Sequence, residues 1–345
     1  MPLPILTSVD EIRNIGPSRR EHFVLPVAQR SSGEMLAIHV HVVTGDRPGP
    51  TLGLVANVHG DASYGGYIVS SFLRRLGHDF AGTVVGIPVA NPIAFESATR
   101  TTGQGWNTDM NNMNRVFPGS RDGWITQKMA AAIAEIVPAF DAMLDYHCGS
   151  DTSINYTLVN GDTTAEQKRI FDYTRLMATN FMFVHDKDPF EGTIDQYAKG
   201  LGILSIVAEQ GGHVLPEGFL DVSMTRIENF MKGLGLMAGE PELPDSQLVM
   251  RRRMLVRPKN GGIFVPAVGV EVLATMVDGG TLLGTVQDPY NLETMEEIRA
   301  PYDRSAIFSM RTRFGRINPG DYGYIIADGD SGEEIPRFEN WKIDL

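Results

Sequence analysis

Two histidines of this chain each follow an apolar run and lie close to glycine, a placement that suits metal binding. His59 follows the run 51–58, and His147 follows the run 140–146. Imidazole nitrogen is a common zinc ligand, and catalytic zinc usually keeps three protein ligands and one open position. One such histidine is more often an ordinary buried or surface residue than a ligand. Two histidines in equivalent places favour a zinc site to which both contribute.

A carboxylate ends a third apolar run and is a candidate general base. Glu209 follows the run 201–208, and a carboxylate there is costly to bury unless it is paired or catalytic. We predict that it takes a proton from metal-bound water. The structural alternative is an ion pair or a cap for the loop that follows.

Two arginines are candidates for binding a substrate. Arg115 lies in the polar segment 109–119, where its guanidinium could hold a substrate carboxylate through two parallel hydrogen bonds, with Asn114 assisting. Arg100 could polarise a scissile carbonyl and stabilise its oxyanion. The alternative for both arginines is a solvated surface charge.

The elements that would position these residues are strands alternating with helices. This order predicts an α/β fold with a mixed, largely parallel sheet flanked by helices, and the carboxyl ends of such strands form the ligand crevice. His59, Asn91, His147 and Glu209 each lie at the end of an apolar run. The predicted strands are 22–27, 35–43, 51–58, 82–90, 140–147, 181–185 and 201–209, and the predicted helices are 63–75, 124–136, 166–177, 194–199 and 222–238.

The pattern changes after a linker rich in proline and acidic residues, 239–245. We predict an α/β catalytic domain over 1–245, which includes the N-terminal strands. Short apolar runs broken by turn signals predict a small antiparallel β domain over 246–330. Residues 331–345 are predicted to be a tail.

Composition excludes several classes of function. The formal net charge of −12 argues against nucleic-acid binding, and the basic cluster 251–253 is too short to change that. No apolar run approaches the ~20 residues that span a bilayer, and the N-terminus lacks the pattern of a secretory signal. The single cysteine, Cys148, fits a reducing cytoplasm. We therefore expect a cytoplasmic protein without membrane or nucleic-acid partners, and keep a homo-oligomer as an expectation because such assemblies are common.

Taken in order, five motifs resemble the succinylglutamate desuccinylase/aspartoacylase family, whose fold is related to the zinc carboxypeptidases. The resemblance covers roughly residues 50 to 325, and the run Asn-Arg-Val-Phe-Pro-Gly together with both histidines is its most specific part. The motifs are His59-Gly60-Asp61, Asn91-Pro92 with Phe95 and Arg100, Asn114 to Gly119, Asp145 to Gly149, and Glu209 to Gly212.

The resemblance implies a zinc hydrolase that cleaves the amide bond of small N-acyl amino acids. By position, His59 and His147 would bind Zn²⁺ and Glu209 would be the base. Arg100 would polarise the acyl carbonyl, while Asn114 and Arg115 would bind the substrate carboxylate. The resemblance leaves the acyl group and the amino acid open.

The chain departs from the family at one metal ligand. The family pattern is His-Gly-x-Glu, and here the glutamate position is Ala62, whose methyl group cannot coordinate a metal. Asp61 could replace it as a shorter carboxylate ligand, which is our default expectation. A water or a distant side chain could complete a weaker site, or the metal could be lost. Asp61 has a structural alternative as the cap of the helix that follows.

These alternatives define three hypotheses. The first is a zinc-dependent deacylase of small N-acyl amino acids. The second, which Ala62 motivates, is a catalytically silent homologue that binds small molecules. The third is a carboxypeptidase-like peptidase, which would need an open cleft for a long chain.

Overall fold

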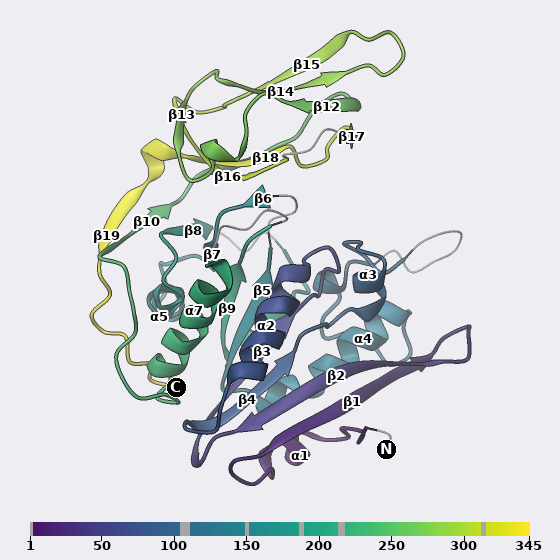
Figure 1. Ribbon diagram of the computed structural model, residues 1–345, viewed down its shortest axis with the longest axis vertical. Helices are drawn as coiled ribbons and strands as arrows, with labels where there is room; N and C mark the ends of the chain where they lie inside the picture. Colours follow the sequence, from purple (N-terminus) through teal and green to yellow (C-terminus); the bar gives the residue numbers. More distant parts are fainter. Residues whose placement is uncertain (1–2, 104–110, 149–151, 186–189, 213–217, 312–314) are drawn as a thin grey trace.

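The computed structural model describes residues 3–103, 111–148, 152–185, 190–212, 218–311 and 315–345. Its centre is a ten-stranded mixed sheet in the order β1-β2-β4-β3-β5-β9-β7-β8-β10-β19, with helices on both faces (Figure 1). The central strands β4, β3, β5 and β9 are parallel. The predicted fold class, a mixed and largely parallel sheet flanked by helices with additional antiparallel β structure, is confirmed.

The elements of the large sheet and its helices are bounded as follows. The helices are α1 (Val9–Arg13), α2 (Ser63–Arg75), α3 (Pro92–Glu96), α4 (Ile125–Ala134), α5 (Ala165–Thr174), α6 (Ile194–Gly200) and α7 (Phe219–Gly233). The strands are β1 (Arg20–Gln29), β2 (Met35–Thr44), β3 (Arg47–Ala56), β4 (Ala81–Ile87), β5 (Ala142–His147), β7 (Tyr156–Asn160), β8 (Phe181–His185), β9 (Leu204–Glu209), β10 (Ser246–Met250) and β19 (Glu333–Pro336).

Two apolar cores cover the two faces of the sheet, because side chains alternate between faces along each strand. One core joins Val55 and Met143 to residues of α4 and α6. The other joins Leu54, Leu144 and Tyr146 to residues of α2 and α7. Consecutive residues of β5 therefore face opposite sides of the sheet.

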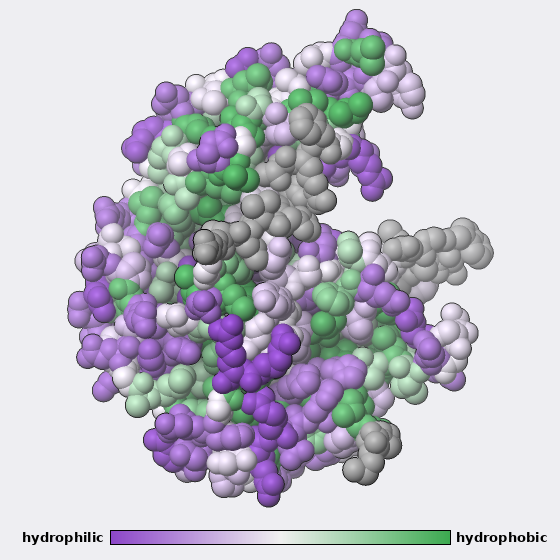
Figure 2. All heavy atoms as spheres, viewed as in Figure 1, coloured by the Kyte–Doolittle hydropathy of each residue, from purple (hydrophilic) through white to green (hydrophobic). Residues whose placement is uncertain are grey.

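Two smaller antiparallel sheets form the C-terminal β structure above the large sheet in Figure 1. One contains β11 (Arg253–Val256), β13 (Met276–Asp278), β16 (Arg304–Met310) and β18 (Tyr324–Asp328), and the other contains β12 (Gly262–Pro266), β14 (Leu282–Gln287), β15 (Thr294–Arg299) and β17 (Gly315–Ile317). The short strand β6 (Thr152–Ser153) follows β5 in the chain, but it pairs with β16 of the C-terminal β structure. Figure 2 shows a notch on one side of the molecule between these sheets and the main body.

The end of the chain returns to the large sheet. Strand β19 pairs with β10, and Phe338 is buried in the core beneath α7. The sequence predicts only a tail over 331–345, and its patterns do not indicate β7, β10 or β19. The division of the chain into 1–245, 246–330 and 331–345 stays a prediction. No described helix is both long and apolar enough to span a membrane.

Candidate functional site

The turn after β3 places His59 through close backbone packing. Asn57 has a left-handed φ of 57°, and its side-chain oxygen accepts a hydrogen bond from the N–H of Gly66 in α2. A Cβ on Gly60 would lie 1.9 Å from the carbonyl carbon of Ala94 in α3. Only glycine allows the two backbones to approach this closely, and the approach fixes the chain on both sides of His59.

His59 and His147 line one pocket at the carboxyl ends of β3 and β5. Both are buried, and their ring centroids are 5.2 Å apart. Two imidazoles on one tetrahedral zinc have centroids ~5 Å apart, because Zn–N is ~2 Å and the nitrogen lies ~1.1 Å from the ring centre. The observed spacing therefore fits two rings that share one ion.

Hydrogen bonds fix which nitrogen of each ring is available. Nε2 of His59 donates to Oδ1 of Asn112 at 2.9 Å, and Nε2 of His147 donates to Oδ2 of Asp145 at 3.0 Å. Metal-binding histidines usually donate their second ring nitrogen to a carbonyl or carboxylate oxygen in this way. The arrangement leaves Nδ1 of each ring for a metal, so these two residues fit zinc.

The third ligand is not placed. Asp61 is partly exposed and is not among the residues that line the pocket. Across the described residues, no three side chains of His, Cys, Asp and Glu are grouped so that they could hold one metal ion. The N-cap residue of α2 is Ala62, which makes no side-chain cap hydrogen bond. The role of Asp61 as a ligand remains a prediction.

The substitution Ala62→Glu tests whether position 62 is a vacated ligand site. Ala62 is buried beside His59, and a carboxylate there would give the two histidines a third protein ligand. We expect the zinc affinity, measured by competition with a chelator, to rise at least ~10-fold. The control is Ser63→Glu, which adds the same charge at the next, exposed position. Equal affinities of the two variants would contradict the assignment.

The two histidines are held in different electrostatic environments. Burial, with the charge of Arg100 and then of His147, lowers the pKa of His59 well below its usual value. Burial alone would also lower the pKa of His147, but the charge and hydrogen bond of Asp145 outweigh it and raise that pKa. Asp145 is itself fully buried. The site thus pairs a neutral imidazole with one that is polarised by a carboxylate.

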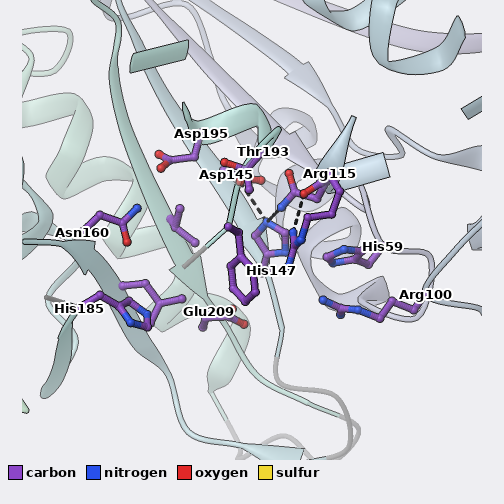
Figure 3. Close-up of a pocket in the computed structure, with 14 residues that line it drawn as sticks. His59, Arg100, Arg115, Asp145, His147, Asn160, His185, Thr193, Asp195 and Glu209 are labelled. Atoms are coloured by element: carbon purple, nitrogen blue, oxygen red, sulfur yellow. Dashed lines mark hydrogen bonds and ion pairs between the residues drawn. The ribbon is translucent and has the colours of Figure 1, made fainter. Parts of the chain in front are cut away.

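Glu209 and Arg100 line the same pocket, with Glu209 next to His147 in the register of β5 and β9. Burial raises the pKa of Glu209, although the charges of His147, Arg253 and Arg100 oppose the shift. In Figure 3 Arg100 lies beside His59, and Glu209 lies on the other side of His147. A base and a cation therefore face the space in front of the histidines.

Asn114 and Arg115 also reach the pocket. The side-chain oxygen of Asn114 accepts from the N–H of Ile194 at 3.0 Å, so it fixes the start of α6, and its nitrogen is 3.4 Å from Nε2 of His147. The Arg115 guanidinium stacks on Phe190, 3.8 Å from the ring centre. This contact holds the guanidinium at the pocket wall, and a guanidinium can bind a carboxylate through two parallel hydrogen bonds.

Several residues of the pocket were missed by the sequence reasoning. Asp145 lies two residues before His147 in one strand and so on the same face, a spacing that could have indicated it. His185 ends the apolar strand β8, as His147 ends β5, and this shared position could have indicated it. Asn112, which accepts a hydrogen bond from His59, lies in the polar segment 109–119, although nothing in that segment set it apart from its neighbours. No sequence signal indicated Asp195. The motif residues Asp109 and Gly149 lie outside the described residues.

Comparison with models of protein families identifies the family of the chain. The model of the succinylglutamate desuccinylase/aspartoacylase catalytic domain matches residues 48–234, more than half of the chain. The chain therefore belongs to this family, as its motifs had indicated. The matched range contains every residue predicted for the site.

One named relative and two solved structures are similar to this chain. An N-α-acetyl-L-2,4-diaminobutyric acid deacetylase of Halomonas elongata is 26% identical over 294 residues, 81% of this chain and 82% of the relative. A succinylglutamate desuccinylase structure from Silicibacter has a TM-score of 0.79 at 21% identity, covering 95% of this chain and 98% of its own. The product-bound ectoine utilization protein EutE (DoeB) from Ruegeria pomeroyi has a TM-score of 0.78 at 22% identity, with 91% and 98% covered. At these identities the two structures establish the fold alone.

Proposed function

We propose that this protein is a zinc-dependent deacylase that hydrolyses the amide bond of small N-acyl amino acids in the cytoplasm. The main support is the arrangement of two histidines at strand ends. His59 donates its Nε2 proton to Asn112 and His147 donates its Nε2 proton to Asp145, and both rings share a pocket with Glu209 and two arginines. Family membership and the activity named for the Halomonas relative support the same reaction class.

Each residue of the pocket has a proposed role in the reaction. Zinc held by His59, His147 and the predicted ligand Asp61 would act as a Lewis acid toward the acyl carbonyl. Glu209 takes a proton from the attacking water and returns it to the leaving amine. Arg100 donates hydrogen bonds to the oxyanion as the carbonyl becomes tetrahedral. The amide and water become a carboxylate and a free amine, so no further reactant is needed.

Asp195 favours a substrate with a second amino group. It is buried in the wall of the pocket, where Oδ2 binds Nζ of Lys199 at 2.7 Å. Its Oδ1 is buried and has no hydrogen-bond partner within the described residues. A carboxylate oxygen in this state is a natural acceptor for an ammonium group. We therefore take N-acetyl-2,4-diaminobutyrate, the substrate type named for the relative, as the lead substrate.

A panel of substrates tests the proposal. The panel compares N-acetyl-2,4-diaminobutyrate with N-acetylaspartate, N-succinylglutamate and short peptides, with amine release as the measurement. The pocket volume of about 570 Å³, counted with the space at its mouth, suits small ligands. We expect acyl amino acids to be cleaved and peptides to be inert. Cleavage of peptides alone would favour the carboxypeptidase-like hypothesis.

The silent binding protein is the second candidate, and Ala62 is the observation that favours it. A site with two imidazoles holds zinc less tightly than a site with three protein ligands. Binding of an N-acyl amino acid without turnover, at zinc concentrations that saturate the protein, would select this candidate. Self-association stays a prediction.

Arg115 is predicted to hold the substrate carboxylate. Arg115→Met keeps much of the apolar contact with Phe190 but removes the charge. We expect KM for N-acyl amino acids to rise ~10- to 100-fold, with a smaller change in kcat. This factor corresponds to the free energy of binding lost with a pair of hydrogen bonds to a charged group. The control is Arg121→Met, which removes an exposed arginine paired with Glu135 outside the pocket. A KM equal to that of the unmodified protein would contradict the role.

A further inference from the structure

A second pocket lies between α7 and the C-terminal β structure. It is bounded by α7, by the segment around β6 and by residues 270–274 of the C-terminal β structure, and its volume is about 1010 Å³ with the space at its mouth. In Figure 1, α7 lies below the sheet that contains β16. The apolar part of the wall is formed by Ile154, Phe181, Phe219, Val270 and Leu273, and the polar residues Thr152, Ser153, Asn155 and Asn180 also line the pocket.

One charged side chain stands in this apolar wall. Arg226 of α7 lines the pocket and is 7% exposed. Its Nη1 donates to Oε1 of Gln210 at 2.7 Å, and its Nε is buried without a hydrogen-bond partner in the described chain. Burial lowers its pKa to about 10. No ion pair joins Arg226 to a carboxylate among the described residues, and a guanidinium buried in this way is costly unless an anion compensates it.

The groups around Arg226 are also donors that lack acceptors. The side-chain nitrogen of Gln210 and the hydroxyl of Tyr146 are both buried without a hydrogen-bond partner in the part of the chain that is described. Burial raises the pKa of Tyr146, and the charge of Arg226 opposes that shift. Unmatched buried donors of this kind are rare in proteins. Of these three residues only Arg226 lines the pocket, so a bound anion would meet its guanidinium.

The second pocket is distinct from the deacylase pocket. Asp145 and His147 face the deacylase pocket, whereas Tyr146 between them packs with α2 and α7. On β9, Glu209 lines the first pocket, while the next residue, Gln210, binds Arg226. No side chain lines both pockets among the described residues. A ligand can therefore occupy one while the other stays accessible.

We propose that this second pocket binds a monocarboxylate with an apolar chain, its carboxylate against Arg226 and its chain along the apolar wall. A single arginine matches the charge of one carboxylate, and the apolar part of the wall, which lies alongside Thr152, Ser153, Asn155 and Asn180, offers contacts to a hydrocarbon chain. The inference concerns binding alone and is independent of the proposed deacylase activity.

Calorimetric titration of the full chain with octanoate tests this site. We expect saturable binding at one site per chain, and octanamide, which has the same chain without the charge, to bind at least ~10-fold more weakly. Arg226→Gln should weaken octanoate binding by a similar factor. Leu273→Trp, which fills the pocket from the opposite wall, should abolish binding even if Arg226 variants fold poorly.

The matched control is Arg115→Met in the deacylase pocket, which should leave octanoate binding unchanged. The proposal is overturned if octanoate does not bind, or if it binds equally well to the protein with Leu273→Trp. It is also overturned if Arg115→Met, rather than Arg226→Gln, removes binding, because octanoate would then occupy the deacylase pocket.

Discussion

Replacing Glu209 by glutamine is expected to lower kcat for amide hydrolysis by about 10²- to 10⁴-fold, the range that general acid–base catalysis contributes. Glutamine keeps the size and polarity of the side chain but cannot accept a proton. Glu209 lies beside His147 at the end of β9 and faces the pocket. Zinc content and substrate affinity should therefore stay close to those of the unmodified protein.

The control for this substitution is Glu228→Gln, which neutralises a carboxylate of α7 that lines a different surface depression. That variant should keep full activity. Retained turnover in Glu209→Gln would refute the role of Glu209 as the base. Loss of zinc together with turnover would instead indicate that Glu209 belongs to the metal site.

His147→Ala is expected to remove zinc and, with it, activity by about three orders of magnitude or more, since metal catalysis contributes several kcal/mol. His147 is the ring that Asp145 orients through a 3.0 Å hydrogen bond. Its loss leaves only His59 of the pair. Zinc per chain, measured by elemental analysis after dialysis against a defined zinc concentration, reports the loss directly.

His185→Ala is the matched control, because His185 is another strand-end histidine in the same pocket. Its Nε2 lies 3.0 Å from a guanidinium nitrogen of Arg253, and burial together with Arg253 lowers its pKa to about 4. We expect this variant to keep its zinc. If both variants kept zinc equally, the assignment of His147 as a ligand would be wrong.

The sequence predicted the parts of the fold that have strong periodic signals. The helix 63–75 has the bounds of α2, and the strands that deliver His59, His147 and Glu209 lie where the apolar runs placed them. Buried parallel strands are nearly continuous apolar runs, so they stand out. Strand β7 was missed because Tyr156–Asn160 is short and mixed in character, and β19 was missed because its exposed edge is polar.

The sequence predicted the site residues that lie at the ends of strands, and it predicted fewer of those that lie elsewhere. Asn112 contacts His59 from the start of a 3-10 turn, and Asp195 reaches the pocket from a short helix. Their positions depend on how distant segments pack. Arg253 acts on Glu209 and His185 from the C-terminal β structure, far along the chain. Its basic neighbours 251 and 252 gave no hint of this, because they form surface ion pairs.

The decisive measurement is release of the free amine from N-acetyl-2,4-diaminobutyrate by metal-free protein and again after zinc is restored. We expect no release without metal and steady turnover once about one zinc is bound per chain. Binding of zinc and substrate without any amine release from this or the other acyl amino acids would contradict the proposed deacylase activity.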